Sequence, residues 1–344
     1  MNSFNLCLMT ITFTFSSICF AQVRDNRFNP SGDFLVDYDF FKMKEGRPIG
    51  STAGISISPD GESIWVFDRC GANDCVGSDL DPIMRFDLEG NQLTSFGSNM
   101  FVRPHGLHID FDGNVWVTDG EGPDGEDSRR EGKGHQVVKF SPNGKVLMTL
   151  GKAGIAGDGD YEFNQPSSVL VAPDGSIFVG DGHGGASNSR IMKYDSSGNF
   201  ILSWGSQGSD PGQFAVPHDL VMDSNGRLFV GDRGNNRVQI FDQDGNFIVE
   251  WEQFGRPSGL FVDDNDMLYV TDSSSENRGP VGTSNNSSPY AEGVRVANVN
   301  NGKVTLFLED PHENGSQEGI VVDKAGNIYG SLTGGRALRK YLLR

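Results

Sequence analysis

Basic residues are scarce in this sequence. Its 344 residues include 28 Lys and Arg against 46 Asp and Glu, which gives a formal net charge of −18. A protein that follows the phosphate backbone of a nucleic acid needs a basic face. We therefore expect no nucleic-acid partner, and we look for a small-molecule or peptide substrate instead.

Long hydrophobic runs are also missing, so we expect no membrane span. The one uncharged apolar stretch, MNSFNLCLMTITFTFSSICFAQ at the start of the chain, is too short to cross a bilayer and ends in the small-residue pattern Cys19, Phe20, Ala21. We predict a signal peptide over residues 1–21 and a secreted or periplasmic protein. No Lys or Arg lies near Met1, and Cys19 leaves a lipoprotein site as an alternative.

Cysteine is rare, with only 4 in the chain. Cys7 and Cys19 fall within the predicted signal peptide, which leaves Cys70 and Cys75. In an exported protein this pair predicts a short-loop disulfide, with two free thiols as the alternative. A zinc clip made of cysteines would need a second pair, and the sequence has none.

No long helical periodicity is present, whereas glycine (46) and phenylalanine (24) are abundant, as in chains of many short strands. One pattern recurs six times: an apolar strand, an Asp-Gly or Asn-Gly turn, a second apolar strand ending near Asp, and a third strand. The clearest copy reads RPHGLHIDFDGNVWVTD followed by HQVVKFSPNGKV. Alternation with period two and turns that need positive φ predict antiparallel hairpins.

Each copy is thus expected to form a four-stranded blade, and six such blades predict an all-β, six-bladed β-propeller over residues 33–344. The last copy ends with little sequence left for a fourth strand. The early segment 33–41, DFLVDYDFF, is expected to supply it, so that the N-terminal strand closes the last blade. A separate N-terminal hairpin is the alternative. We expect a monomer.

The repeats resemble the NHL family across the chain after about Asp33, as in GDRGNNRVQIFDQDGNF over residues 231–247. Most insertions fall between the second and third strands of a repeat, so one face of the ring should be elaborated. Loops on a rigid scaffold are where binding and catalysis concentrate. On that face the first strands begin at equivalent positions, which are Ala53, His105, Ser167, His218, Ser258 and Glu318.

His105 and His218 each follow a proline and should point toward the common axis, where imidazole nitrogens suit Zn²⁺. The alternative is a repeat that merely prefers a polar residue there, as Ser167 shows. Arg69 and Arg233 each follow the Asp that ends a second strand, so they could clamp a carboxylate. Ion pairs between blades are the alternative for both arginines.

Two segments, RPHGLHIDFDGNVWVTD and GQFAVPHDLVMDSNGRLFVGDRGNNRVQIF, resemble the peptidyl-α-hydroxyglycine α-amidating lyase family, and FNQPSSVLVAPDGSIFVGDGH extends the likeness. The resemblance covers the first four blades best. It implies cleavage of a C-terminal α-hydroxyglycine into a peptide amide and glyoxylate at a zinc ion held by three histidines.

By this resemblance, two zinc ligands correspond to His105 and His218, and the third position holds Glu318, with nearby His312 as an alternative ligand. The family's substrate-binding arginines correspond to Arg69 and Arg233, and its catalytic tyrosine corresponds to His183, a possible general base. A structural Ca²⁺ would use the carbonyls of Ile55 and Leu107, but the family's aspartate is replaced by Gly319.

Two other functions stay open at this point. A calcium-dependent lactonase-type hydrolase would also work at the mouth of a propeller, and a non-catalytic propeller would use its elaborated face to bind a peptide or glycan. Bound zinc favours the lyase, and bound calcium favours the lactonase.

Overall fold

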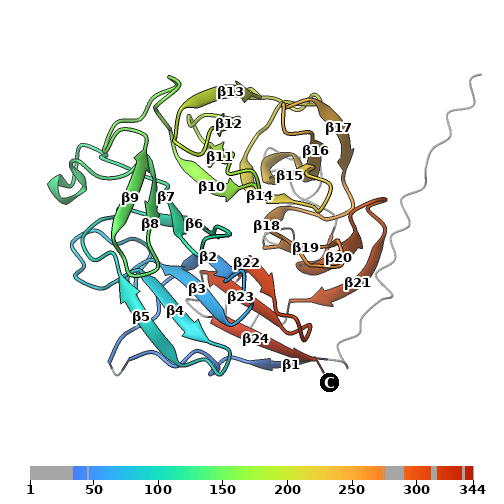
Figure 1. Ribbon diagram of the computed structural model, residues 1–344, viewed down its shortest axis with the longest axis horizontal. Helices are drawn as coiled ribbons and strands as arrows, with labels where there is room; N and C mark the ends of the chain where they lie inside the picture. Colours follow the sequence, from blue (N-terminus) through green and yellow to red (C-terminus); the bar gives the residue numbers. More distant parts are fainter. Residues whose placement is uncertain are drawn as a thin grey trace, which may run out of the picture.

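Six four-stranded antiparallel sheets surround a central axis in the computed structural model (Figure 1). The structure describes residues 34–44, 46–273, 275, 290–310, 316–334 and 338–343. The predicted signal peptide and His312 lie outside these residues. The all-β six-bladed β-propeller predicted from the sequence is confirmed.

Each of the first five sheets takes its strands in chain order, from the axis outward (Figure 1). The first sheet contains β2 (Thr52–Ile57), β3 (Ser63–Asp68), β4 (Ile83–Asp87) and β5 (Gln92–Phe96). The second contains β6 (Pro104–Ile109), β7 (Val115–Asp119), β8 (Gln136–Phe140) and β9 (Val146–Leu150). The third contains β10 (Pro166–Val171), β11 (Ile177–Asp181), β12 (Arg190–Tyr194) and β13 (Phe200–Trp204).

The fourth sheet contains β14 (Pro217–Met222), β15 (Leu228–Asp232), β16 (Arg237–Phe241) and β17 (Phe247–Trp251). The fifth contains β18 (Pro257–Val262), β19 (Met267–Asp272), β20 (Gly293–Asn298) and β21 (Val304–Glu309). The described residues also form two short 3₁₀ turns, η1 (Ser128–Arg130) and η2 (Arg233–Asn235). No helix among them is long and apolar enough to cross a membrane.

The sixth sheet combines the two ends of the described chain. It contains β22 (Ser316–Val322), β23 (Ile328–Thr333), β24 (Leu338–Leu343) and, as its outermost strand, β1 (Phe34–Asp37). In this antiparallel pair Val36 lies opposite Tyr341, and the two strands run side by side in Figure 1. Beyond β1 the chain leaves the sheet, and Phe41 packs edge-to-face on Phe86 of the first sheet.

Hydrophobic side chains from adjacent sheets interlock to form the core. Trp65 and Phe67 of the first sheet, for example, belong to one buried cluster with Val115 and Val117 of the second. Each sheet has two faces, and each face packs against one of the two adjacent sheets. Both faces of every blade are therefore buried in the ring.

Two faces of the ring differ in their loops. The hairpin face carries the short turns between first and second strands, at residues 58–62, 110–114, 172–176, 223–227, 263–266 and 323–327. The insertion face carries the longer connections between second and third strands, such as residues 69–82 and 120–135. The candidate site residues lie at the start of the first strands and just after the second strands, on the insertion face.

Candidate metal centre

A β-bulge lies at the start of every innermost strand. The register between first and second strands shifts around one residue in each blade, and these residues are Ala53, His105, Ser167, His218, Ser258 and Glu318. A bulge sets two residues against one on the partner strand and redirects a side chain. Four of the six bulges follow a proline at the first strand position, where a ladder donor is not needed.

The rings of His105 and His218 are fixed from the next blade. His105 Nδ1 lies 2.7 Å from the carbonyl oxygen of Ser167, and His218 Nδ1 lies 2.6 Å from that of Ser258. A carbonyl oxygen can only accept, so both Nδ1 atoms carry the proton. In the neutral rings the Nε2 lone pairs therefore remain available, and both Nε2 atoms are buried.

Glu318 brings a carboxylate to the same place from β22. Its Oε1 lies 2.9 Å from His218 Nε2 and 3.1 Å from Arg233 Nη1, while its Oε2 accepts a hydrogen bond from Thr333 at 2.9 Å. A carboxylate oxygen beside an imidazole lone pair is repulsive unless a proton or a cation lies between them. The pairing thus indicates a position for a proton or a metal ion.

His183 joins from the loop after β11. The ligand atoms of His105, His183, His218 and Glu318 all lie within 4.8 Å of one another, and we call these four residues the His/Glu cluster. The ring centroids of His183 and His105 are 4.5 Å apart. Gly182 makes this approach possible, because a Cβ there would collide with the carbonyl of Asn188. The backbone N–H of His183 donates to Ser187.

Arg69 leaves the end of β3 and is buried beside the cluster. Its Nε donates to the carbonyl of Pro104 at 3.0 Å, and its Nη1 donates to Asn73 Oδ1 at 2.9 Å. Burial and the nearby charge of Arg103 lower the pKa of Arg69 to about 10. The guanidinium therefore remains charged at neutral pH.

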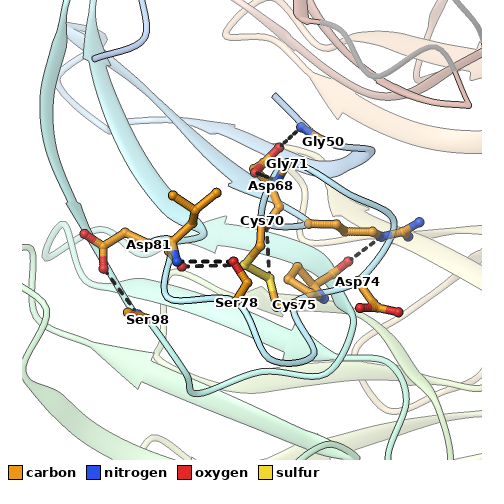
Figure 2. Close-up of a disulfide and its surroundings, with 12 residues drawn as sticks. Gly50, Asp68, Cys70, Gly71, Asp74, Cys75, Ser78, Asp81 and Ser98 are labelled. Carbon is orange, nitrogen blue, oxygen red and sulfur yellow. Dashed lines mark hydrogen bonds between the residues drawn. A yellow bond between two sulfur atoms is a disulfide. The ribbon is translucent and has the colours of Figure 1, made fainter. Parts of the chain in front are cut away.

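The Cys70–Cys75 disulfide predicted from the sequence is confirmed, with 5.0 Å between the Cα atoms. Figure 2 shows it closing the loop that directly follows Asp68, whose carboxylate accepts the backbone N–H groups of Gly50 and Gly71. This small loop carries Asn73, so the disulfide constrains the residue that holds Arg69.

Arg233, the first residue of η2, contacts two members of the cluster. Besides Glu318, its Nη2 lies 3.3 Å from His183 Nε2. A guanidinium can only donate, so His183 Nε2 accepts and its neutral ring carries the proton on Nδ1.

Burial sets the charges within the cluster. Burial is the main cause that holds the pKa of His105 and of His183 well below 6.5. The neighbouring His218 and Arg69 lower the pKa of His105 further. His105 and Arg233 do the same for His183. Burial alone would raise the pKa of Glu318, but hydrogen bonding and charge from His218, with Arg233, outweigh it and hold this pKa well below 4.5. Neutral imidazoles and an ionised carboxylate are the protonation states that bind metal ions.

The donor set fits zinc better than calcium. Three imidazole nitrogens and one carboxylate are ligands that Zn²⁺ uses, whereas Ca²⁺ takes six to eight oxygens. His105, His218 and Glu318 would form a three-ligand site with an open position, the pattern of catalytic zinc. Ligation by His183 would close the coordination shell.

A cavity of about 870 Å³ follows the axis below the cluster. His105, His218 and Glu318 line its inner end, and the turns of the hairpin face line the other. Ile55, Leu107 and Gly319, the positions expected around a structural Ca²⁺, also line this cavity. Gly319 supplies no carboxylate there.

The residues predicted from the sequence lie together, but some of the residues that support them were not predicted. The predicted ligands His105, His218 and Glu318 converge, and His183, Arg69 and Arg233 surround them. Asn73 and Thr333 were not anticipated, since neither stands in a motif. Asp219, which follows His218 and lines the cavity, was visible in the Pro-His-Asp triplet but was not singled out.

Comparison with known proteins agrees with this architecture. A family model described as "NHL repeat" matches residues 214–241. Peptidylglycine alpha-amidating monooxygenase of Rattus norvegicus is 34% identical over 230 residues, which are 59% of this chain and 22% of that protein. A probable peptidyl-alpha-hydroxyglycine alpha-amidating lyase of Caenorhabditis elegans is 32% identical over 204 residues, or 54% of each chain.

The chain thus spans between about a fifth and about a half of the length of these relatives. Among solved structures, a gluconolactonase from Xanthomonas campestris superimposes with a TM-score of 0.60 at 14% identity, covering 91% of each chain. This likeness shows a shared fold. The chain is therefore a six-bladed β-propeller that contains a match to the NHL repeat and resembles the peptidyl-α-hydroxyglycine α-amidating lyases.

Proposed function

We propose that this protein is a zinc-dependent lyase that cleaves a peptidyl-α-hydroxyglycine, or a similar hydroxylated amide, into an amide and glyoxylate. The observation that carries the proposal is the convergence of His105, His218 and Glu318 on one point beside Arg69 and Arg233. The sequence relationship to proteins named for this activity supports it.

The substrate's carboxylate is expected to bind the arginines. Arg69 uses Nε and Nη1 in contacts with the protein, and its Nη2 forms no hydrogen bond within the described chain. A guanidinium in a buried, water-poor site binds a carboxylate strongly. Arg233 lies between Glu318 and His183, so a carboxylate that attracts its Nη2 would release His183 Nε2.

His183 would then act as the base. Its low pKa keeps the ring neutral at physiological pH, so Nε2 can accept the proton of the substrate hydroxyl. As this proton leaves, the C–O double bond forms and the C–N bond breaks, and the leaving amide nitrogen takes up a proton. Charge and atoms balance if His183 returns the same proton.

His105, His218 and Glu318 would hold the zinc ion. When bound, zinc supplies a Lewis acid that stabilises negative charge developing on a substrate oxygen. The Nδ1 contacts to Ser167 and Ser258 fix the ligand rings, as the outer contacts of metal-binding histidines usually do.

The test measures metal content and glyoxylate release together. We expect about one zinc per chain in the purified protein, and loss of both zinc and activity in His105→Ala and His218→Ala. His108→Gln is the matched control, because His108 lies on the same strand as His105 but outside the cluster. Protein without metal, or full activity in both alanine variants, would refute the proposal.

His183→Gln separates the two possible roles of that residue. A base can be lost without loss of metal, so we expect retained zinc and a fall in kcat of at least about a hundredfold. Loss of zinc would make His183 a fourth ligand instead. Bound calcium, with hydrolysis of lactones, would favour the lactonase-type function.

We also propose that the protein works outside the cytoplasm. The disulfide is of a kind that persists in oxidising compartments, and the chain begins with an uncharged apolar segment. Mass spectrometry of the mature protein, with cleavage after Ala21, would test this.

A further inference from the structure

The cavity along the axis connects the metal centre with the hairpin face. It extends between the innermost strands from His105, His218 and Glu318 to the turns of the hairpin face. Apolar side chains such as Leu220, Met222 and Val262 line much of its wall. The cluster residues can therefore be approached along the axis from the hairpin face.

The charges near the axis differ between the two faces of the ring. On the insertion face, the cluster is flanked by Arg69 and Arg233, with Arg103 near enough to lower the pKa of Arg69. At the hairpin face, the mouth of the cavity is lined by Asp223, Asp263, Asp264, Asp266 and Asp323. Lys324 is the only Lys or Arg that lines the cavity within the described chain.

Some of these carboxylates already form contacts within the protein. Asp223 pairs with Arg227, and Asp266 accepts hydrogen bonds from Ser224 of the neighbouring blade. Asp264 is exposed at the mouth, and no hydrogen bond or ion pair joins its side chain to another described residue. The mouth therefore keeps an excess of negative charge.

Asp219 places a carboxylate in the wall between the mouth and the cluster. The equivalent residues of the other blades are small, namely Gly54, Gly106, Ser168, Gly259 and Gly319. Asp219 lies opposite Gly231 in the sheet.

The hydrogen bonds of Asp219 leave part of its carboxylate available. Its Oδ1 accepts from Ser168 Oγ and the N–H of Leu220, and its Oδ2 accepts from the N–H of Leu260 at 2.8 Å. Burial raises the pKa of Asp219, whereas an approaching cation would favour the ionised form. An ionised carboxylate offers about four acceptor positions, so one position on Oδ2 remains. No Lys or Arg of the described chain forms an ion pair with it.

We propose that the axial cavity is the route by which a divalent metal ion reaches the cluster, with Asp219 as a transient ligand on the way, while the anionic substrate approaches from the insertion face. The inference rests on the metal centre of the proposed function. Separate routes suit the charges, because an approaching cation is attracted by the carboxylates and repelled by the buried arginines.

The test follows metal uptake by the apoprotein. Zinc is transferred from a coloured chelator in a stopped-flow instrument, and the final zinc content is measured by elemental analysis. We expect Asp219→Asn to slow uptake by on the order of tenfold, with an unchanged final content of zinc. Uptake should also slow as ionic strength rises, because salt screens the attraction of the mouth.

Two further variants make the result specific. Met222→Trp narrows the cavity without removing a carboxylate, and it should slow uptake as well. Glu126→Gln removes an exposed carboxylate from the insertion face and should leave the rate unchanged. Circular dichroism checks that each variant is folded, and Met222→Trp keeps the test decisive if Asp219→Asn does not fold.

Unchanged uptake in both cavity variants would overturn the route. Loss of equilibrium zinc in Asp219→Asn, or a second tightly bound metal ion that depends on Asp219, would make this residue part of a resident site and overturn its transient role. Because the readout is uptake and not turnover, the route survives if zinc binds but no lyase activity is found.

Discussion

Glu318 is the residue on which the chemistry of the cluster depends most. Its Oε1 faces His218 and Arg233, and its Oε2 is held by Thr333. Glu318→Gln keeps the size of the side chain but replaces an anionic ligand with a neutral amide. We expect zinc affinity to fall by roughly tenfold to a hundredfold, measured by competition with a chelator. Unchanged affinity would show that the carboxylate is not a ligand.

The support of Arg69 gives a second prediction at the level of single residues. Asn73 binds Arg69 from within the loop closed by Cys70 and Cys75. In the variant with both Cys70→Ser and Cys75→Ser, we expect KM to rise by about tenfold, as for the loss of one hydrogen bond to a charged group, with kcat and zinc content almost unchanged.

Asn73→Ala is the matched variant for that experiment, because it removes the contact while the disulfide remains. A similar rise in KM in both variants would support a positioning role. A change confined to thermal stability would show instead that the disulfide only stabilises the fold.

Most of this site was predictable from the sequence because the repeat itself supplies the alignment. Once the blades are in register, His105, His218 and Glu318 occupy the same position in three of them, and Arg69 and Arg233 occupy another. The distances between rings, and the contact between His183 and Arg233, depend on the bulges and on the closure of the ring. No spacing in the sequence encodes them.

Among the elements, the second strands of the first five sheets end in buried aspartates, and these accept hydrogen bonds from the chain that enters the blade. Asp119 accepts the N–H groups of Val102 and Arg103, and Asp181 accepts that of Asn164. Burial raises the pKa of Asp119 to about 7 and that of Asp181 to about 6.

These pKa values predict a pH-dependent stability. Between about pH 4 and 7 the native protein holds a proton on Asp119 that the unfolded chain has released, so the free energy of unfolding should fall as pH rises through this range. A tenfold change in proton affinity corresponds to about 1.4 kcal/mol, which gives a fall of roughly 4 kcal/mol from Asp119.

Urea unfolding of the apoprotein at a series of pH values measures this effect. The metal is removed so that the histidines do not dominate the pH dependence of the free energy of unfolding. Asp119→Asn should flatten the curve, because the amide does not titrate. Equal slopes in the variant and the natural protein would assign the pH dependence to other groups.

The element level also shows where sequence patterns are reliable. Asp-Gly and Asn-Gly turns with period-two alternation predict the hairpins of each blade, since both features arise within a few residues. The strand predicted over residues 33–41 is shorter in the structure, Phe34–Asp37. Phe41 instead packs on Phe86, which is a tertiary contact that local alternation does not reveal.

For the whole molecule, closure of the ring depends on the ladder between β1 and β24. Val36→Pro removes a backbone donor within the edge strand β1 and should lower the free energy of unfolding by about 1 kcal/mol, measured by chemical denaturation. Ser98→Pro would be a poor control because its N–H donates to Asp81, as Figure 2 shows. Val36→Thr, which keeps the donor and the β-branched shape, is the matched one.

If Val36→Pro unfolds in the same single transition at the same denaturant concentration as Val36→Thr, β1 does not contribute to closure. A loss of stability, with zinc still bound to the native protein, would show that the closing strand stabilises the fold without affecting the metal centre, which lies on the innermost strands.

The pairing of Phe34 with Leu343 places the start of β1 next to the end of β24. A turn of a few residues between them would turn the sixth sheet into a simple meander like the other five. The ring would then have no intrinsic beginning, and the polypeptide could be opened at a loop of the insertion face or the hairpin face instead. Circularly permuted forms of this protein should therefore keep the axis, and the ions and molecules that meet there, in the same arrangement.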